Sequence, residues 1–454
     1  MKYLALCIGV LALWPIYIIF RSYPSMRKYV WVALGVLPFL SIVLPFLDVA
    51  LISWGDFWTG YVPGLQVTAI DIIAVFLFFS VRKNPTFKSL HVLFGLNLLA
   101  LSLSMIQADE PLATGFAVWQ FVRVYFLAVL VAKACTDDAV AYQLLKGLSL
   151  GLAIQFIAVI WQKFGQGMVQ PTGTFVHQNT LGLITHLVVF PNFALLLAGQ
   201  RQIQSGASVA MGLVIAALIA SRGALGFTGF GFSATYLLSF VRKWSKRKAL
   251  LGLAGVFAVA GLVPIAMSSL ATRFDAVPLL DEEYDERAAF NRTAIAILEA
   301  NPLGIGANHY SYVGKNYGYS VRSGVAPIEG SLNNIVHNAY LLAAAETGYF
   351  GCFSFTLLMI FPIAVAFRYA WGVRGNPSGD LLLGLGVAMT TVCFHSLFEY
   401  IVVIKEVQYV MAIVVGMTFG LAKQRVMRRG HGMVSAGRPA AQPRAAGEAA
   451  YSRR

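Results

Sequence analysis

The feature that most constrains this chain is a repeated pattern of long apolar runs. A helix that crosses a bilayer needs about 20 mostly apolar residues, because its backbone polar groups must be satisfied within the helix. Thirteen runs come near this requirement, at residues 3–20, 29–47, 66–81, 89–106, 115–132, 147–162, 180–199, 206–220, 224–240, 249–268, 347–367, 380–398 and 407–422. The pattern predicts an all-α polytopic membrane protein with about 12–13 transmembrane helices.

Composition excludes a water-soluble fold of this length. The chain has 454 residues, of which 58% are hydrophobic and 12% charged, whereas soluble domains carry roughly 25% charged residues. Runs 206–220 and 224–240 are separated only by Ser221-Arg222-Gly223, so they are either two helices or one long broken helix. We expect the first run to be a retained span, because no small-residue cleavage site follows it.

The basic residues predict the orientation of the helices. Most of the 34 lysines and arginines fall in alternate loops and in the C-terminal tail, whereas the loops holding Asp48 and Asp109 have none. Because cytoplasmic loops are enriched in Lys and Arg, the basic side is predicted to be cytoplasmic. The net charge of +14 is therefore a topology signal, and no nucleic-acid partner is expected. Thirteen spans place the N-terminus outside; with twelve, the miscount lies in the first run or the close pair.

One long polar stretch interrupts the apolar pattern. Residues 269–346 lie on the predicted outer side and hold nine of the chain's 20 acidic residues. A helix is expected over Glu286–Glu299, ended by Asn301-Pro302, within a loop whose length is typical of a functional segment. The predicted divisions are N-terminal helices (1–162), central helices (163–268), the large periplasmic loop (269–346), C-terminal helices (347–422) and a disordered basic cytoplasmic tail (423–454).

The first candidate for chemistry is His337, in the sequence Val-His337-Asn338-Ala-Tyr340. Histidine is the side chain best suited to proton transfer near neutral pH. His337 stands where the polar loop returns to the membrane, so a base there would face both water and the headgroup layer. The competing interpretation is that His337 caps a helix or meets a lipid headgroup.

Three arginines on the outer side could bind an anion. Arg222 lies between two apolar runs, and its guanidinium can grip a phosphate in two places; alternatively, it extends to the membrane surface. Arg287 and Arg292 lie on the expected loop helix and could hold an anionic ligand together. The alternative for this pair is solvated ion pairs with the neighbouring acidic cluster 281–286.

Two further sets of polar residues are weaker candidates. The turn Gly173–Asn179, which includes His177, could shape a sugar or diphosphate pocket, or could be an ordinary interfacial turn. Arg123 lies near the middle of the span 115–132, where a charge costs at least ~2.5–3 kcal/mol. It must face the protein interior or water, and pairing with Asp71 is weighed equally with substrate binding.

The sequence lacks the motifs of several common chemistries. It contains no Walker loop, no GxGxxG motif, no HExxH motif and no cluster of Cys and His with metal-ligand spacing. We therefore expect neither nucleotide hydrolysis nor a bound metal or cofactor.

Taken in order, these motifs resemble a known family. Arg287, the turn Asn301-Pro302-Leu-Gly304-Ile-Gly306, and His337-Asn338-Ala-Tyr340-Leu with Glu346 resemble the signature region of the O-antigen ligase and polymerase superfamily. The segments at 173–179 and 221–223 are also similar. The resemblance spans roughly residues 165–365. The first five apolar runs match only in hydrophobicity.

The resemblance implies a membrane glycosyltransferase of the Gram-negative inner membrane with its active site facing the periplasm. Such enzymes move a glycan from undecaprenyl diphosphate to an acceptor sugar hydroxyl, inverting and without a metal or cofactor. It implies that His337 is the base and that Arg222 and Arg287 bind diphosphate, with Arg292 as a further possibility. Weaker substrate contacts are expected from His177, Asn179, Asn338, Tyr340 and Arg123.

The acceptor separates two activities within this family. A ligase uses the lipid A core, and this is the activity favoured here. A polymerase instead extends a lipid-linked repeat to build O-antigen or exopolysaccharide. Outside the family, a transporter or flippase is the remaining alternative, although no second copy of the polar segment occurs in the N-terminal half, as repeated transporter halves would require.

Overall fold

The structure is a computed structural model that describes residues 22–40, 48–81, 86–276, 281–371 and 376–436, with a few isolated positions before residue 45. The side chains of residues 24, 56, 275–276, 281–285 and 428–436 are not described. The predicted span 3–20 lies almost wholly outside the described residues, as does the predicted tail from residue 437 onwards.

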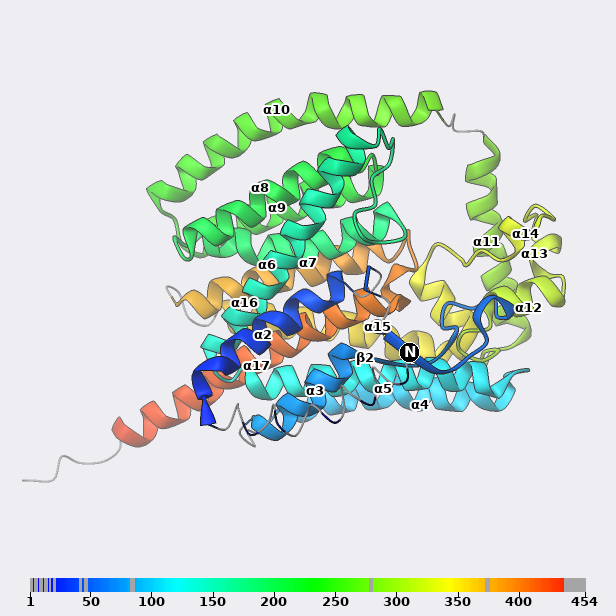
Figure 1. Ribbon diagram of the computed structural model, residues 1–454, viewed down its shortest axis with the longest axis horizontal. Helices are drawn as coiled ribbons and strands as arrows, with labels where there is room; N and C mark the ends of the chain where they lie inside the picture. The colour runs from blue at the N-terminus through cyan, green and yellow to red at the C-terminus, as the bar shows by residue number, and fades with distance from the viewer. Residues whose placement is uncertain are drawn as a thin grey trace, which may run out of the picture.

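The described chain is a bundle of helices (Figure 1). The elements of its first half are α2 (Arg27–Val36), β1 (Asp48–Ser53), β2 (Gly64–Thr68), α3 (Ala69–Ser80), α4 (Lys88–Ser104), α5 (Pro111–Ala134), α6 (Asp138–Ile160), α7 (Gln178–Leu197) and α8 (Gln202–Leu218). Those of the second half are α9 (Arg222–Arg242), α10 (Lys246–Ala276), α11 (Asp281–Ala300), α12 (Tyr310–Asn316), α13 (Tyr319–Arg322), α14 (Glu329–Leu332), α15 (Ala339–Trp371), α16 (Pro377–His395) and α17 (Lys405–Ala436).

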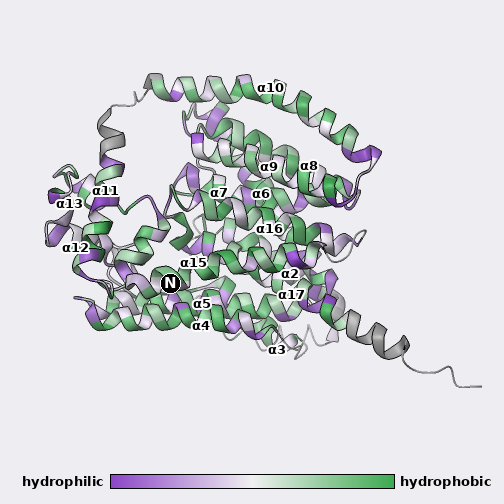
Figure 2. Cartoon of the chain, turned by 180° about the vertical axis from the view of Figure 1, so that it is seen from behind, coloured by the Kyte–Doolittle hydropathy of each residue, from purple (hydrophilic) through white to green (hydrophobic). Residues whose placement is uncertain are grey.

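The predicted all-α membrane fold is confirmed. Within the described residues, nine helices are long and apolar enough to cross a membrane, and α3 and α8 are shorter apolar helices. Figure 2 shows that hydrophobic residues predominate along these helices. In the same view the region of α11–α13 is more polar. Helix α7 is largely enclosed by its neighbours, whereas α10 is almost entirely exposed, which suits a helix surrounded by lipid.

Three local predictions can be compared with the structure. Runs 206–220 and 224–240 form two separate helices, α8 and α9, joined through Ala220, whose φ is 50°. The predicted span 29–47 differs, because α2 ends at Val36 and Pro38 lies in the short 3₁₀ turn that follows. Helix α17 continues to Ala436, beyond the predicted start of the disordered tail at 423.

The acidic loop between the second and third predicted spans contains a β-hairpin that was not predicted. β1 and β2 pair antiparallel, with Asp48 opposite Thr68 and an irregularity between Ala50 and Ile52. The hydroxyl of Thr68 then caps α3, and the Asp71 carboxylate accepts from the Thr68 backbone N–H at 2.8 Å. The hairpin ends where this reciprocal cap starts the helix.

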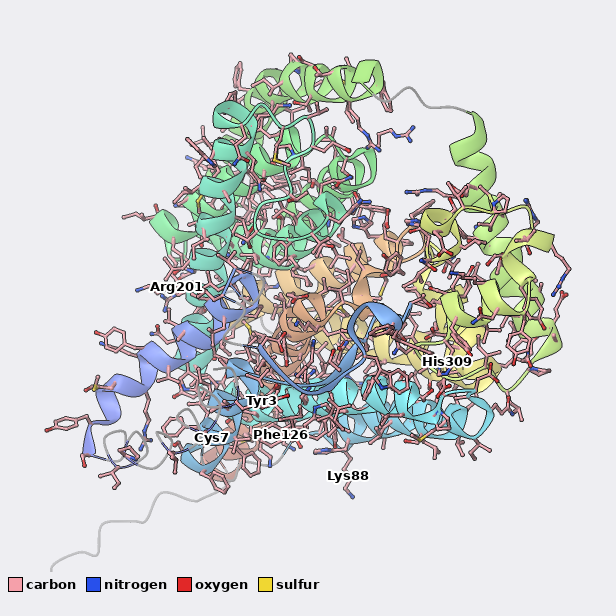
Figure 3. All side chains as sticks on the ribbon, turned by 45° about the vertical axis from the view of Figure 1, so that its right-hand side comes forward. Tyr3, Cys7, Lys88, Phe126, Arg201 and His309 are labelled. Carbon is pink, nitrogen blue, oxygen red and sulfur yellow. The ribbon has the colours of Figure 1, made fainter. Side chains whose placement is uncertain are left out.

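The polar segment between α10 and α15 gathers at one end of the bundle, at the right of Figure 1. It contains the predicted helix over Glu286–Glu299, which is confirmed as part of α11. Figure 3 places His309 of this segment and Arg201, which precedes α8, at opposite ends of the helical body. Arg201 was predicted to lie on the cytoplasmic side and the polar segment on the outer side, and the two lie at different ends of the bundle.

A break in α15 attaches the polar segment to the bundle. Gly348 has a φ of 69°, which interrupts the helix. The turn that includes Gly304 enters this break: Gly306 N–H donates to the Glu346 carbonyl at 3.0 Å, and Tyr349 N–H donates to the Pro302 carbonyl at 3.2 Å. The turn therefore satisfies backbone groups that the interrupted helix leaves open.

We expect Gly348→Ala to destabilise the protein. The positive φ costs a residue with a Cβ about 1–3 kcal/mol, and a Cβ there would also collide with the Pro302 carbonyl oxygen. The measurement is the apparent Tm of the purified protein in detergent. Gly95→Ala on α4 is the matched control, because a Cβ there meets nothing within 4 Å. An unchanged Tm for Gly348→Ala would contradict the proposed lock between the turn and the helix break.

Candidate active site

The candidate site lies at the polar end of the bundle, where several chain segments converge on one carboxylate. We use the name Glu399 cluster for Glu399 and the side chains that bond to it directly or through one neighbour. The cluster consists of His177, Asn179, Ser221, Arg287, His337 and Glu399. The segments that supply them are the starts of α7 and α9, the first half of α11, and the loops before α15 and after α16.

Glu399 is the centre of this cluster, and sequence reasoning did not identify it. The residue is only 4% exposed. Its Oε1 atom accepts a hydrogen bond from Asn179 Nδ2 at 2.5 Å and lies 3.5 Å from the Arg287 guanidinium, while Oε2 lies 3.1 Å from His337 Nδ1. The signal that could have revealed it is an acidic residue directly after the apolar run 380–398, on the predicted outer side.

The surroundings of Glu399 keep its carboxylate ionised. Burial by itself would raise the pKa of this carboxyl, but the hydrogen bond from His337 and the charges of His337 and Arg287 act in the opposite direction. The net effect is a pKa below the usual value of a glutamate. The stability contributed by these contacts is therefore present at neutral pH and lost only as the pH falls through that lowered pKa.

The contact with Glu399 determines which nitrogen of His337 carries a proton. An ionised carboxylate can only accept hydrogen bonds, so His337 Nδ1 must donate and a neutral ring keeps an unprotonated Nε2. The side chain is 26% exposed, and its ring lies near those of Phe290 and Tyr400, with centroids 6.2 and 5.7 Å away. This arrangement is suited to a general base.

The residues after His337 anchor it beside the end of α16. Asn338 Oδ1 accepts from the backbone N–H groups of Tyr340 and Leu341 at 3.0 and 3.1 Å, which caps α15. Tyr340 donates its hydroxyl proton to the Cys393 carbonyl at 3.1 Å. These polar atoms of Asn338 and Tyr340, which were predicted to contact the substrate, are therefore hydrogen-bonded within the protein beside His337.

The start of α7 supplies His177 and Asn179 together. His177 precedes the helix, and its Nδ1 accepts from the Asn179 backbone N–H at 3.2 Å. The side chain of Asn179 links two other segments, because its Oδ1 accepts from Ser221 Oγ at 2.8 Å while its Nδ2 donates to Glu399. The structure thus places His177 and Asn179, two of the residues predicted to contact the substrate, in the Glu399 cluster.

Arg222 begins α9 next to this network. Ser221 caps the helix by accepting from the Ala224 N–H at 3.2 Å. The guanidinium of Arg222 lies over the Phe274 ring, 5.3 Å from its centroid, and Arg273 lies 5.9 Å from the same centroid. Arg273 also donates to the Ala220 carbonyl at 3.0 Å. Arg273, at the end of α10, is a second residue that sequence reasoning did not identify.

The structure separates the two arginines of α11. Residues five positions apart in a helix point about 140° apart, so Arg287 and Arg292 cannot share one face. Arg292 donates through Nε and Nη2 to the Ser323 carbonyl at 3.0 and 2.9 Å, which fastens the end of α13. Arg287 reaches Glu399 instead. Of the acidic cluster 281–286, the alternative partners predicted for this pair, the side chains of residues 281–285 are not described.

Arg123 lies outside the Glu399 cluster, in a buried network of its own. It is 5% exposed, and its Nη1 atom lies 2.8 Å from Asp71 Oδ2 and 2.7 Å from the Tyr409 hydroxyl. Tyr409 also bonds to Asp71 and to Thr68. These contacts join α3, α5 and α17. They agree with the predicted alternative in which Arg123 pairs with Asp71.

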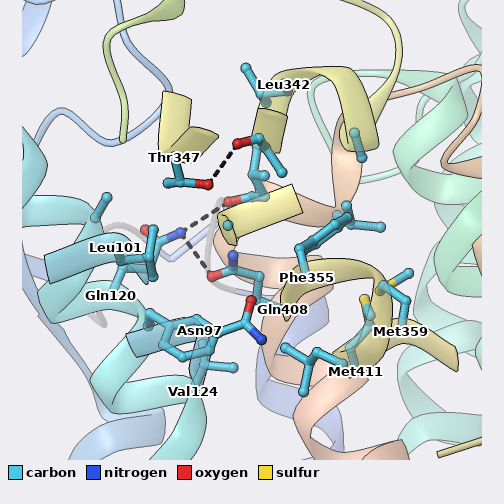
Figure 4. A pocket seen from close by; sticks show the side chains of 18 of the residues that line it. Asn97, Leu101, Gln120, Val124, Leu342, Thr347, Phe355, Met359, Gln408 and Met411 are labelled. Carbon is cyan, nitrogen blue, oxygen red and sulfur yellow. Dashed lines mark hydrogen bonds between the residues drawn. The ribbon is translucent and has the colours of Figure 1, made fainter. Parts of the chain in front are cut away.

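A cavity of about 120 Å³ lies between α4, α5, α15 and α17 (Figure 4). Its lining is mostly apolar, and Glu346 is its one charged residue. The Glu346 carboxylate accepts from the Tyr61 hydroxyl at 2.7 Å and the Tyr310 N–H at 3.0 Å, while Gln120 donates to Gln408 at 2.9 Å. These polar groups are satisfied by the protein, so the cavity offers little for a reaction between polar substrates.

The described residues contain no group of three or more His, Cys, Asp or Glu side chains arranged to hold a metal ion. The Glu399 cluster instead offers a histidine and an arginine, His337 and Arg287, that share one carboxylate, and Arg222 and Arg273 lie next to the cluster. Such an arrangement can accept a proton and bind an anion.

Comparison with known proteins agrees with the resemblance seen in the sequence. Residues 207–356 match the family model described as O-antigen ligase, which confirms the resemblance to the O-antigen ligase and polymerase superfamily. The matched segment includes Arg222, Arg273, Arg287 and His337, but neither Asn179 nor Glu399. No curated protein matches the chain.

We expect Arg123→Gln to lower the stability of the protein, because it leaves Asp71 buried without its cation. Removing one partner of a buried ion pair typically costs about 3–5 kcal/mol. The measurement is the apparent Tm in detergent, and the double variant Asp71→Asn/Arg123→Gln should recover part of the loss. If Arg123→Gln were as stable as the wild type, the structural role of this pair would be wrong.

Proposed function

We propose that this chain, whose residues 207–356 match the O-antigen ligase family, is a multi-pass membrane glycosyltransferase of the bacterial inner membrane with its active site facing the periplasm. It moves a glycan from undecaprenyl diphosphate to a sugar hydroxyl of the lipid A core and inverts the configuration at the transferred sugar.

The observation that carries this proposal is the grouping of basic side chains with a buried carboxylate at the Glu399 cluster. Among the described side chains, Arg287 and His337 contact the buried Glu399 carboxylate, and His177 is bonded to Asn179 beside it. Arg222 and Arg273 lie at the Phe274 ring, next to the adjoining start of α9. A leaving diphosphate gains negative charge as the bond to the sugar breaks, and fixed cations stabilise that charge most effectively where water is limited. We assign Arg222 and Arg287 to the diphosphate, and Arg292 to support of the loop.

The proposed reaction is a single displacement. The acceptor hydroxyl gives its proton to Nε2 of His337 while its oxygen forms a bond to the anomeric carbon of the glycan. The bond between that carbon and the diphosphate oxygen breaks, and the diphosphate leaves with the electron pair. His337 then releases its proton to water on the outer side. Glu399 stabilises the imidazolium formed during the reaction, because its carboxylate faces Nδ1.

The polymerase alternative uses the same chemistry with a lipid-linked repeat as the acceptor. The transporter alternative is disfavoured because the polar groups of the Glu399 cluster lie at one end of the bundle, whereas transporter sites lie near the midplane. The midplane charge Arg123 is paired with Asp71 in the described structure.

The test uses purified protein in lipid bilayers with undecaprenyl-diphosphate-linked glycan and two separate acceptors. Transfer to lipid A core, with inversion detected by NMR of the product, is the expected result. Elongation of a lipid-linked repeat with the core untouched would replace the ligase by a polymerase. An absence of transfer to both acceptors would reject the proposed enzyme and favour the transporter.

We expect His337→Ala to lower kcat by about 10²–10⁴-fold, because general acid–base catalysis typically contributes this much. Arg222→Ala and Arg287→Ala should each lower kcat by about 10²–10³-fold, the usual cost of one group that stabilises transition-state charge. The measurement is initial-rate glycan transfer with each purified variant.

Matched controls exist elsewhere in the described chain. His91→Ala alters a histidine of α4 that bonds to Thr86 and Tyr125, and Arg322→Ala alters an arginine stacked on Tyr319. Both controls should retain wild-type rates. Full transfer by His337→Ala would disprove its role as the base.

A further inference from the structure

Arg287 has two competing partners in the proposed site, the donor diphosphate and Glu399. It is assigned to the donor diphosphate, yet its Nη2 atom lies 3.5 Å from Glu399 Oε1. The same carboxylate holds His337 through its other oxygen at 3.1 Å. The Glu399 carboxylate therefore interacts with a substrate-binding arginine and with the base at the same time.

The two partners of this ion pair differ in freedom to move. The Arg287 side chain is 43% exposed, whereas the Glu399 side chain is only 6% exposed. Glu399 is also held by Asn179 at 2.5 Å, and Asn179 is held in turn by Ser221 at 2.8 Å. The arginine can turn towards a ligand in water, while the carboxylate stays against His337.

We propose that Glu399 is the positioning residue of His337 and that the Arg287–Glu399 contact couples donor binding to the base. An incoming diphosphate draws Arg287 away from Glu399. The carboxylate then acts on His337 without a competing cation, so the base gains proton affinity when the donor is in place. This inference rests on the proposed function, because it assigns His337 and Arg287 to the same reaction.

The physical basis is the effect of nearby charge on proton binding. A carboxylate favours the protonated form of a neighbouring imidazole, and a cation beside that carboxylate weakens the effect. Arg287 is among the groups that lower the pKa of Glu399, so the two side chains interact electrostatically. The other charged or titratable groups around the pair are His177, Arg273, His395 and Tyr400. His177 interacts with both Glu399 and Arg287, but of all these groups only Arg287 is both assigned to the diphosphate and in contact with the Glu399 carboxylate.

The experiment measures the protonation of His337 directly. The full-length protein in lipid is treated with diethyl pyrocarbonate over a range of pH, and modification of the His337 peptide is quantified by mass spectrometry. Inorganic diphosphate serves as the probe for the donor. In the wild type, the pH of half-maximal modification should rise when diphosphate is added.

Two variants separate the proposed coupling from a direct effect of the anion. Glu399→Gln should lower the midpoint and make it largely insensitive to diphosphate, because the carboxylate is absent. Arg287→Gln, which changes an exposed side chain and should fold normally, should raise the midpoint before any diphosphate is added. Arg322→Gln is the control and should behave as the wild type does.

Either of two results would overturn the inference. An equal upward shift with diphosphate in Glu399→Gln would mean that the anion acts on His337 directly. An unchanged midpoint in Arg287→Gln would mean that the arginine does not restrain Glu399. Since this titration needs no glycan transfer, it can succeed where the transferase assay fails, and the two proposals can be rejected separately.

The role of Glu399 in catalysis has its own readout. Glu399→Gln should lower kcat by about 10²–10⁴-fold without raising KM for the donor, because loss of the carboxylate removes the preferred tautomer and orientation of the base but leaves Arg287 available to the diphosphate. Glu399→Asp should restore part of the rate. Glu329→Gln, at an exposed ion pair with Lys315, should leave the rate unchanged. A fall in activity caused only by a higher KM would contradict the positioning role.

Discussion

The attachment of the polar segment to α15 is the constraint on which the candidate site depends. A helix surrounded by lipid must satisfy its backbone groups internally, yet α15 breaks at Gly348. The break is tolerated because the turn at 302–306 supplies hydrogen-bonding partners within the protein. Helix α11, which carries Arg287, leads directly into this turn. The contact therefore joins α11 to α15, the helix that starts just after His337.

Glu346 strengthens the same junction with its side chain. Its carboxylate accepts from Tyr61 in the loop between β1 and β2 and from the backbone of Tyr310 at the start of α12. A buried carboxyl group is costly unless it is hydrogen-bonded, so its partners are strongly constrained. The N-terminal hairpin and the C-terminal half of the polar segment consequently meet at one residue of α15.

Charged groups inside the bundle serve two different purposes. Arg123 with Asp71, and Arg242 with Asp380, form buried ion pairs between helices far apart in sequence. The Glu399 cluster also uses ion pairing, but its arginine is substantially exposed and its histidine partly so. Exposure leaves these groups able to exchange partners, and this distinguishes a site for a charged ligand from a structural pair.

Much of the architecture follows from the sequence because the bilayer imposes a simple rule. Apolar runs of sufficient length must become helices, and this identifies α4–α7, α9, α10 and α15–α17 without knowledge of packing. The rule is weaker for short elements. Pro38 limits α2, and the hairpin of β1 and β2 depends on pairing between strands that alternation of residues alone did not reveal.

The sequence by itself determined the residue types of the candidate site: His337 beside Asn338, arginines at 222 and 287, and the glycine turn at 302–306. Only the tertiary structure decided which of them meet. In the structure Glu399 lies at the centre of the site, Arg287 pairs with it, and Arg292 donates to the Ser323 carbonyl. The reason is physical: hydropathy and local spacing report the environment of each segment, whereas the partner of a charged side chain depends on contacts between helices distant in sequence.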